Sequence, residues 1–190
     1  MRKSYYIVLM IGLFVACNVF EPRSAAPPES LAEWHVFATT HEKCLENLEF
    51  AYKHRQNVYQ YGSIFSDDFI FYFDSQDITD FSAPRFWRKA EEIDMLINAY
   101  LHTVNIQEIE LELDKIENKN DSFHGNYAWI FRSYELHVNH SPPNIGHSFS
   151  GSLQLLLEME GGIWKIKEWH DLRNQQNIPT WGRMKNAFAS

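Results

Sequence analysis

The stretch SFSGSLQLLLEMEGGIWKIKEWHDL, residues 148–172, decides the fold. In its first half, apolar residues alternate with polar ones, which is the pattern of a β-strand with one face on a core and the other toward water. Gly161 and Gly162 then form a two-residue connection, a strong signal for a β-hairpin. The sequence therefore predicts two antiparallel strands, the first of which points these residues inward: Phe149, Leu153, Leu155, Leu157 and Met159.

Two more strands precede this hairpin. From Val104 the period is two, with Ile109 and Leu111 on one side, and a change of phase predicts a β-bulge near residues 107–108. The segment 123–138 carries large residues on both faces, which indicates a strand covered on both sides. Its two faces are formed by Phe123, Tyr127, Trp129 and Phe131, and by Ile130, Tyr134, Leu136 and Val138.

The N-terminal half predicts two amphipathic helices with a buried strand between them. The first helix runs from about Thr40 to Tyr61, where Gly62 ends it, and residues 69–73 (FIFYF) form the strand. After a polar loop, Pro84 begins a second helix. Its apolar side chains recur at helical spacing: Phe86, Ala90, Ile93, Ile97, Tyr100 and Leu101.

This order of elements, ending in GGIWKIKEWHD, resembles the nuclear transport factor 2-like superfamily. That superfamily includes ketosteroid isomerases, SnoaL-like polyketide cyclases and non-enzymatic binding domains. The resemblance implies an α+β fold, in which a cone-shaped, curved antiparallel sheet of about four long strands packs against two or three N-terminal helices. The domain is then residues 39–175, and residues 176–190 are a C-terminal tail that packs on it.

Three smaller features are similar to those of uncharacterised bacterial lipoproteins with this domain. They are the FxF segment at Phe71 to Phe73, Pro84 with Trp87 at the start of the second helix, and Trp181-Gly182 in the tail. Because one fold hosts many functions, the resemblance implies a ligand pocket in the cone without naming its chemistry.

The first seventeen residues, MRKSYYIVLMIGLFVAC, resemble a bacterial lipoprotein signal. Arg2 and Lys3 precede a nine-residue apolar run, which is too short to span a bilayer. Residues 1–16 are then the signal peptide, and residues 17–38 are the lipidated Cys17 and a flexible tether rich in Pro, Ser and Ala. The alternatives are an ordinary signal peptide and an uncleaved anchor. The expected location is the cell envelope, on the outer membrane facing the periplasm if the cell is Gram-negative.

Charge excludes two classes of partner. The chain has 17 Lys and Arg against 25 Asp and Glu, and cleavage after residue 16 would remove two of the cations. Nucleic acids and anionic lipid surfaces need a basic footprint, so membrane attachment is expected through lipid alone. The other cysteine, Cys44, lies on a helical apolar stripe and is expected to be a buried thiol rather than a nucleophile.

Three residues are candidates for catalysis: Arg55, His170 and Asp171. Arg55 shares the apolar face of the first helix, so it needs a carboxylate partner, either Glu168 or Asp171. That pair is either part of a ligand site or an internal ion pair that fixes the helix. His170 and Asp171 are sequence neighbours, so their side chains point to opposite faces of the strand. His170 is either a pocket base or a histidine with a structural or surface role.

A ketosteroid-isomerase-like pocket would combine a carboxylate base with a hydroxyl donor. Asp171 is the candidate acceptor, and the candidate donors are Tyr52, Tyr59 and Tyr100. Neither a cofactor motif nor a metal motif is present, and we expect no cofactor. Two groups of possible ligands lack metal spacing: His137, His140 and His147 in a loop, and Asp74, Asp77 and Asp80 in what we expect to be a solvated turn.

The leading functional hypothesis is a lipid-anchored envelope domain that binds a small ligand or partner protein without turnover. The alternatives are a cone-pocket isomerase or cyclase that uses Asp171 or His170, and a structural dimerisation module. A homodimer through the convex face of the sheet would cover Phe123, Tyr127, Trp129 and Phe131. In a rival arrangement the tail covers the same aromatics through Ile178, Trp181, Met184 and Phe188.

Overall fold

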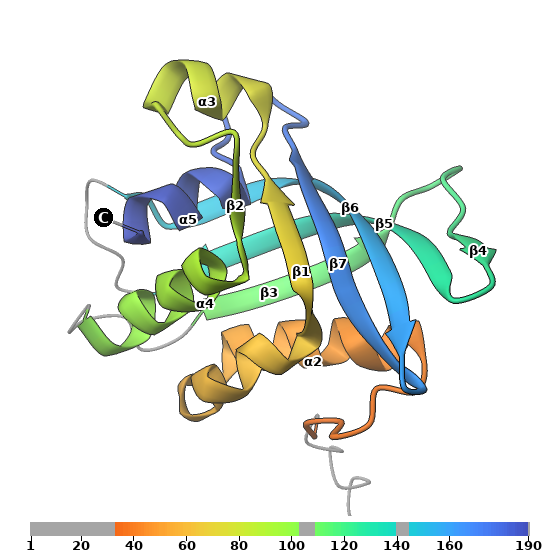
Figure 1. The fold of residues 1–190 in the computed structure, drawn as a ribbon. Coiled ribbons are helices and arrows are strands. Elements are labelled where there is room, and N and C mark those ends of the chain that lie inside the picture. The colour runs from red at the N-terminus through yellow and green to blue at the C-terminus, as the bar shows by residue number, and fades with distance from the viewer. Residues whose placement is uncertain (1–32, 103–108, 140–144, 190) are drawn as a thin grey trace, which may run out of the picture. The chain divides into compact units, whose positions relative to one another are not determined.

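A computed structural model describes residues 33–102, 109–139 and 145–189 of the chain. It shows an α+β fold with one sheet and helices packed against it (Figure 1). In chain order the elements are α2 (His41–Lys53), the 3₁₀-helix η2 (Arg55–Ile64), β1 (Phe65–Tyr72), α3 (Ser75–Phe81), β2 (Phe86–Arg88), α4 (Lys89–Ile97), the π-helical turn η3 (Asn98–His102), β3 (Ile109–Lys115), β4 (Ser122–His124), β5 (Tyr127–Val138), β6 (Ser148–Glu160), β7 (Ile163–Leu172) and α5 (Trp181–Phe188).

The predicted α+β class is confirmed, and the sheet is larger than predicted. It has seven strands in the order β2-β1-β7-β6-β5-β3, with β4 paired to β5. The long strands β3, β5, β6 and β7 are antiparallel neighbours, whereas β1 runs parallel to β7, so the sheet is mixed. Several sequence predictions lie outside the described residues: the signal peptide, Cys17, the tether to residue 32, the bulge at 107–108 and His140.

The first predicted helix is two helices in the structure. Thr40 caps α2, as expected, but the α-helix ends at Lys53 and His54 is extended. The chain then continues as 3₁₀-helix, whose three residues per turn bury Val58, Tyr61 and Ile64. Gly62 is not the helix end: a Cβ there would lie 2.7 Å from the side chain of Ile93 on α4.

The second predicted helix begins later than Pro84. Phe86–Arg88 instead form the edge strand β2, which pairs with β1 through Tyr72 and Phe86. Only from Lys89 is the chain helical, where the Glu91 carboxylate accepts from the Arg88 backbone N–H at 3.1 Å. The residues between β1 and β2 are not a solvated turn, because they contain the short helix α3 with Asp77 fully buried.

The predicted strand 123–138 is broken by a tight turn. Gly125 has φ +60°, and the turn separates β4 from β5, so Phe123 pairs with Ala128 instead of extending β5. The inward set is as predicted, with Ile130, Tyr134, Leu136 and Val138 buried.

The ends of the domain differ from the predicted boundaries. Trp34 and Ala38 pack on the domain rather than belonging to a free tether: the ring centroids of Trp34 and Phe50 are 6.2 Å apart, and the Ala38 carbonyl accepts from the Trp164 N–H at 2.8 Å, while Val36 and Phe37 between them are exposed. At the other end α5 lies beside α4 (Figure 1). Its buried residues include Trp181, so the tail fills the interior and does not cover the outer aromatic residues.

A bulge in β7 sets which residues face the interior. Leu157 pairs with Ile166 but Leu156 pairs with Glu168, so Lys167 is an extra residue. Beyond the bulge Trp169 and Asp171 are buried, while His170 lies on the opposite, outer face. No described helix has the length and apolar composition needed to cross a membrane.

Candidate functional site

The interior of the domain contains a buried ion pair between two helices. Lys185 of α5 donates from Nζ to Glu92 Oε1 of α4 at 2.5 Å, and both side chains are 0 % exposed. Trp87 Nε1 donates to the other oxygen, Oε2, at 2.8 Å, and the Tyr61 hydroxyl also donates to Oε1. Glu92 is therefore held by three donors from three different elements.

Aromatic rings surround the ammonium group of Lys185. Its Nζ lies 3.5 Å from the ring centroid of Trp169, 3.9 Å from that of Phe71 and 5.3 Å from that of Trp181. Cation–π attraction and the Glu92 carboxylate offset part of the cost of burying the charge. Burial affects the pKa of Lys185 more strongly than the nearby Glu92 carboxylate does, and it lowers this pKa to about 8.

Trp181 occupies the centre of this interior. Its ring is T-shaped against Tyr52 at 4.9 Å and against Trp169 at 4.4 Å, and it lies 5.2 Å from Tyr134. Its indole N–H donates to the Tyr52 hydroxyl at 3.0 Å. Burial raises the pKa of Tyr52 well above its usual range, so its hydroxyl stays neutral.

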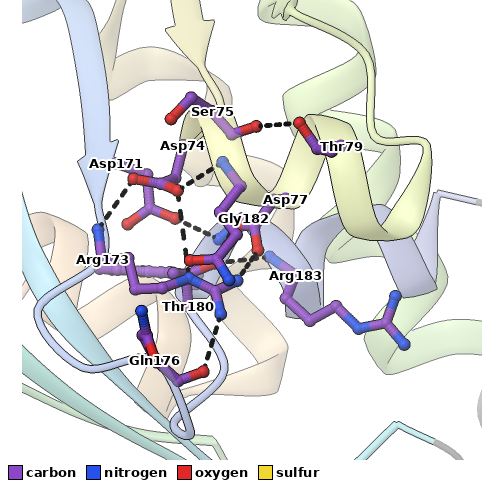
Figure 2. A network of polar contacts seen from close by, with 12 residues as sticks. Asp74, Ser75, Asp77, Thr79, Asp171, Arg173, Gln176, Thr180, Gly182 and Arg183 are labelled. Atoms are coloured by element: carbon purple, nitrogen blue, oxygen red, sulfur yellow. Dashed lines mark hydrogen bonds and ion pairs between the residues drawn. The ribbon is translucent and has the colours of Figure 1, made fainter.

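A second polar network surrounds the N-terminus of α5 (Figure 2). Asp171 accepts from the Tyr134 hydroxyl at 2.7 Å and from the Gly182 N–H at 2.6 Å. Burial raises the pKa of Asp171 to about 6, and these two donors oppose the rise. The Tyr134 oxygen also accepts from the Trp181 N–H at 2.8 Å. The first N–H groups of α5 are therefore satisfied by groups from β5 and β7.

Asp77 completes this network from α3. Its carboxylate accepts from the Thr180 hydroxyl and from the Arg173 guanidinium, and Asp74 accepts from the Arg173 backbone N–H at 3.1 Å (Figure 2). A Cβ at Gly182 would lie 2.8 Å from the Asp171 carboxylate, so only glycine fits at this approach. The network fastens the start of α5 to β5, β7 and α3.

The predicted site residues are not brought together. Asp171, Tyr52 and Tyr100 are buried, and Tyr100 donates to the Tyr52 carbonyl. Arg55 and Tyr59 are exposed, so the prediction that Arg55 is buried opposite Glu168 or Asp171 is wrong. The reason is the helix break at residue 54, after which the side chains follow the 3₁₀ period.

Glu168 and His170 lie on the outer face of the sheet. Glu168 Oε2 and His170 Nε2 are 3.1 Å apart, and the His170 ring stacks on Tyr72 at 4.4 Å. His170 and Asp171 therefore lie on opposite sides of β7, as predicted. Cys44 is buried, and burial raises the pKa of its thiol to about 12.

Two hollows open on the surface. One, of about 350 Å³, lies over β3, β5 and β6, and the other, of about 250 Å³, lies between residues 35–38 and the start of β7. Neither is lined by Glu92, Lys185 or Asp171. Within the described ranges no three His, Cys, Asp or Glu side chains are grouped to hold a metal ion. The first hollow is lined by Glu110, Glu112, Glu135, Leu136, His137, Ser148, Phe149, Ser150 and Ile178.

Sequence reasoning missed the residues that matter most in the interior, Glu92 and Lys185. A signal for both was present. Glu92 precedes Met95 and Leu96 at helical spacing, and Lys185 lies four residues after Trp181 and three before Phe188. Each charged residue therefore shares a helix face with apolar ones, and their opposite charges suit a pair.

Comparisons with known proteins support the fold. No family model matches the chain, and no curated protein matches it. Among solved structures, the chain is similar to a protein from Novosphingobium aromaticivorans described as the beta subunit of a candidate aromatic-ring-hydroxylating dioxygenase, with 13 % identity, a TM-score of 0.53, and coverage of 76 % of this chain and 94 % of the other.

Two further structures align over similar lengths. A candidate scytalone dehydratase from the same organism shows 11 % identity and a TM-score of 0.53, covering 74 % of this chain and 90 % of its own. A Nostoc punctiforme protein of unknown function with a cystatin-like fold shows 11 % identity and a TM-score of 0.50, covering 73 % and 90 %. Identities this low indicate a shared fold and not a shared activity. The described residues form an α+β domain with the fold of the nuclear transport factor 2-like superfamily.

Proposed function

We propose that the protein is a lipid-anchored cell-envelope domain that binds a partner protein without turnover, through the outer face of its sheet. The observation that carries the proposal is the position of α5, whose Trp181 and Lys185 are fully buried in the interior against Tyr52, Trp169 and Glu92. Glu92 is hydrogen-bonded to Lys185, Trp87 and Tyr61 within the chain, whereas the buried Trp169 Nε1 beside Lys185 has no hydrogen-bond partner among the described residues. A small ligand would have to displace this helix before it could bind there.

The outer face carries aromatic side chains that the described residues leave partly exposed. Phe86 is 48 % exposed, and Tyr72, His170, Phe131 and Trp129 are half-buried in neighbouring strands. The register places Phe86, Tyr72 and His170 side by side, and the same row continues to Phe131. Gln154 of β6 lies between His170 and Phe131 in this row, and an exposed group of aromatic side chains of this kind is typical of a protein interaction surface.

A second copy of the chain is the partner that we propose for this surface. The outer patch consists of Tyr72, Phe86, Trp129, Phe131 and His170, and a two-fold axis would place it against itself. Of the four aromatic residues that the sequence predicted to be covered in a dimer, Trp129 and Phe131 belong to the outer patch. Phe123 does not, because it lies on β4, across the tight turn from β5, with its ring 4.8 Å from that of His41.

The membrane attachment is proposed from the sequence. Cys17 follows a signal-like apolar run, and the packed domain begins at about residue 34. A diacylglyceryl group on Cys17 would supply the two acyl chains that stable anchoring requires. The domain itself would then not need an apolar or basic membrane surface.

Fluorotryptophan NMR distinguishes outer binding from interior binding. The chain has six tryptophans, of which Trp129 lies on the outer face while Trp169 and Trp181 line the interior. On dilution of a chain labelled with 5-fluorotryptophan, we expect the Trp129 resonance to shift as copies separate, with the interior resonances unchanged. Addition of apolar ring compounds should leave the interior resonances unchanged too. Saturable shifts of Trp169 and Trp181 would contradict the proposal and favour the cone-pocket enzyme.

A further inference from the structure

The buried pair Glu92–Lys185 places an amine in direct contact with a carboxylate. The amine nitrogen lies 2.5 Å from a carboxylate oxygen, and the two residues are 93 positions apart in the chain. Both side chains are fully buried. Because α4 and α5 hold the amine and the carboxylate in place, little conformational entropy is lost when the two groups react. Effective molarities for well-oriented intramolecular reactions reach about 10⁵–10⁸ M.

Burial lowers the pKa of Lys185 to about 8, so part of the amine is neutral near this pH. The rings of Phe71, Trp169 and Trp181 replace water around Lys185 Nζ. Transfer of one proton from the Lys185 ammonium to the Glu92 carboxylate gives an amine and a carboxylic acid and removes both buried charges. A neutral amine is a nucleophile, and a protonated carboxyl group is an electrophile.

The two oxygens of Glu92 have different partners, which assigns their roles. Oε2 accepts from the Trp87 indole N–H at 2.8 Å, a fixed donor that can stabilise negative charge on this oxygen in a tetrahedral intermediate. Oε1 contacts both Lys185 Nζ and the Tyr61 hydroxyl. Tyr61 is therefore placed to relay a proton to Oε1 as that oxygen leaves.

We propose that Glu92 and Lys185 are a modification site, at which the two side chains condense into an intramolecular amide cross-link. Lys185 Nζ forms a bond to the Glu92 side-chain carboxyl carbon, and the bond from this carbon to Oε1 breaks. The protons that leave the nitrogen depart with Oε1 as one water molecule. Ammonium and carboxylate are thereby converted to amide and water, with no oxidant, reductant or co-substrate.

The cross-link has a structural consequence. Replacing two buried charges by one neutral amide removes the desolvation cost of the pair, and the aromatic surroundings keep out the water that would reverse the reaction. It would fasten α5 to α4 covalently. The described part of the chain has no disulfide that could do so, since its one cysteine, Cys44, is buried as a free thiol.

Peptide mapping of the full-length protein tests the proposal without any variant. Trypsin cuts after Lys89, Lys115 and Arg183, but it does not cut after a lysine whose amine is part of an amide. We expect denatured, digested protein to yield peptide 90–115 joined to peptide 184–190, with a mass one water below the sum of the two. Recovery of free 90–115 and free 186–190 in full yield would overturn the proposal.

Two variants localise the bond. Lys185→Met keeps the length of the side chain but removes the amine, so the joined peptide should disappear. Lys167→Met is the matched control, because Lys167 also contacts a carboxylate at 2.5 Å, that of Glu158, but on the surface. The control should retain the joined peptide, and a joined peptide that persists in Lys185→Met would contradict the assignment.

Discussion

Replacing Trp181 by Ala should open the interior of the domain. The Trp181 side chain is fully buried against Tyr52, Tyr134 and Trp169, and it donates one hydrogen bond at 3.0 Å. Removing a buried tryptophan costs about 3–5 kcal/mol, and the lost hydrogen bond adds about 1 kcal/mol. At about 2–4 °C per kcal/mol for a domain of this size, we expect the melting temperature to fall by roughly 10–20 °C.

Thermal unfolding followed by circular dichroism measures this loss. Phe123→Ala is the control, since Phe123 is 52 % exposed on β4 and its truncation should cost about 1 kcal/mol or less. Indole added to Trp181→Ala should restore part of the melting temperature, because the cavity has the shape of the missing ring and a ligand that binds only the folded state stabilises it. A fall no larger than that of Phe123→Ala would refute the conclusion that α5 fills the interior.

Three further predictions concern charges and the anchor. Burial raises the pKa of Asp171 from 3.8 to about 6, so between these values the folded chain binds more protons than the unfolded chain. The free energy of unfolding should therefore fall by about 3 kcal/mol as the pH rises through this window. Asp171→Asn should flatten that fall in urea titrations at pH 4 to 6. Arg132→Ala should cost about 3–5 kcal/mol, because it removes the guanidinium that lies 2.8 Å from the partly buried Asp121 carboxylate and leaves this charge without a partner. Arg55 is exposed, so Arg55→Ala should change the free energy of unfolding by less than about 0.5 kcal/mol. Equal losses in chemical denaturation would contradict this prediction. Cys17→Ser should abolish incorporation of labelled palmitate and leave the precursor uncleaved, and a mature N-terminus at another residue would show that the lipoprotein interpretation is wrong.

Much of the sheet could be predicted from the sequence, because the alternation of residues is a local property. The hairpin at Gly161-Gly162 and the inward set of β6 needed only the two-residue period. The helix break at His54 could not be predicted, since Val58, Tyr61 and Ile64 fit a 3₁₀ spacing as well as an α-helical stripe. That single error misplaced Arg55.

The interior cluster depended on contacts distant in sequence. The sequence left open which residues of β7 face the interior, and the inward position of Asp171 follows from the bulge at Lys167, which the side-chain pattern does not reveal. Lys185 shares a helix face with Trp181 and Phe188, but this local pattern does not show which element the face packs against. Its partner, Glu92, is 93 residues away, and the pairing depends on how α4 and α5 pack.

Sedimentation equilibrium of the chain from residue 18 onward tests the outer-face account most directly. The account predicts a dimer that Trp129→Glu dissociates without a large loss of melting temperature, because the Trp129 side chain lies on the outer face and its substitution opens no interior cavity. Glu135→Lys, farther along β5 and exposed, is the control that should remain dimeric. A wild-type chain that is monomeric at all concentrations, or a Trp129→Glu variant that stays dimeric, would contradict it.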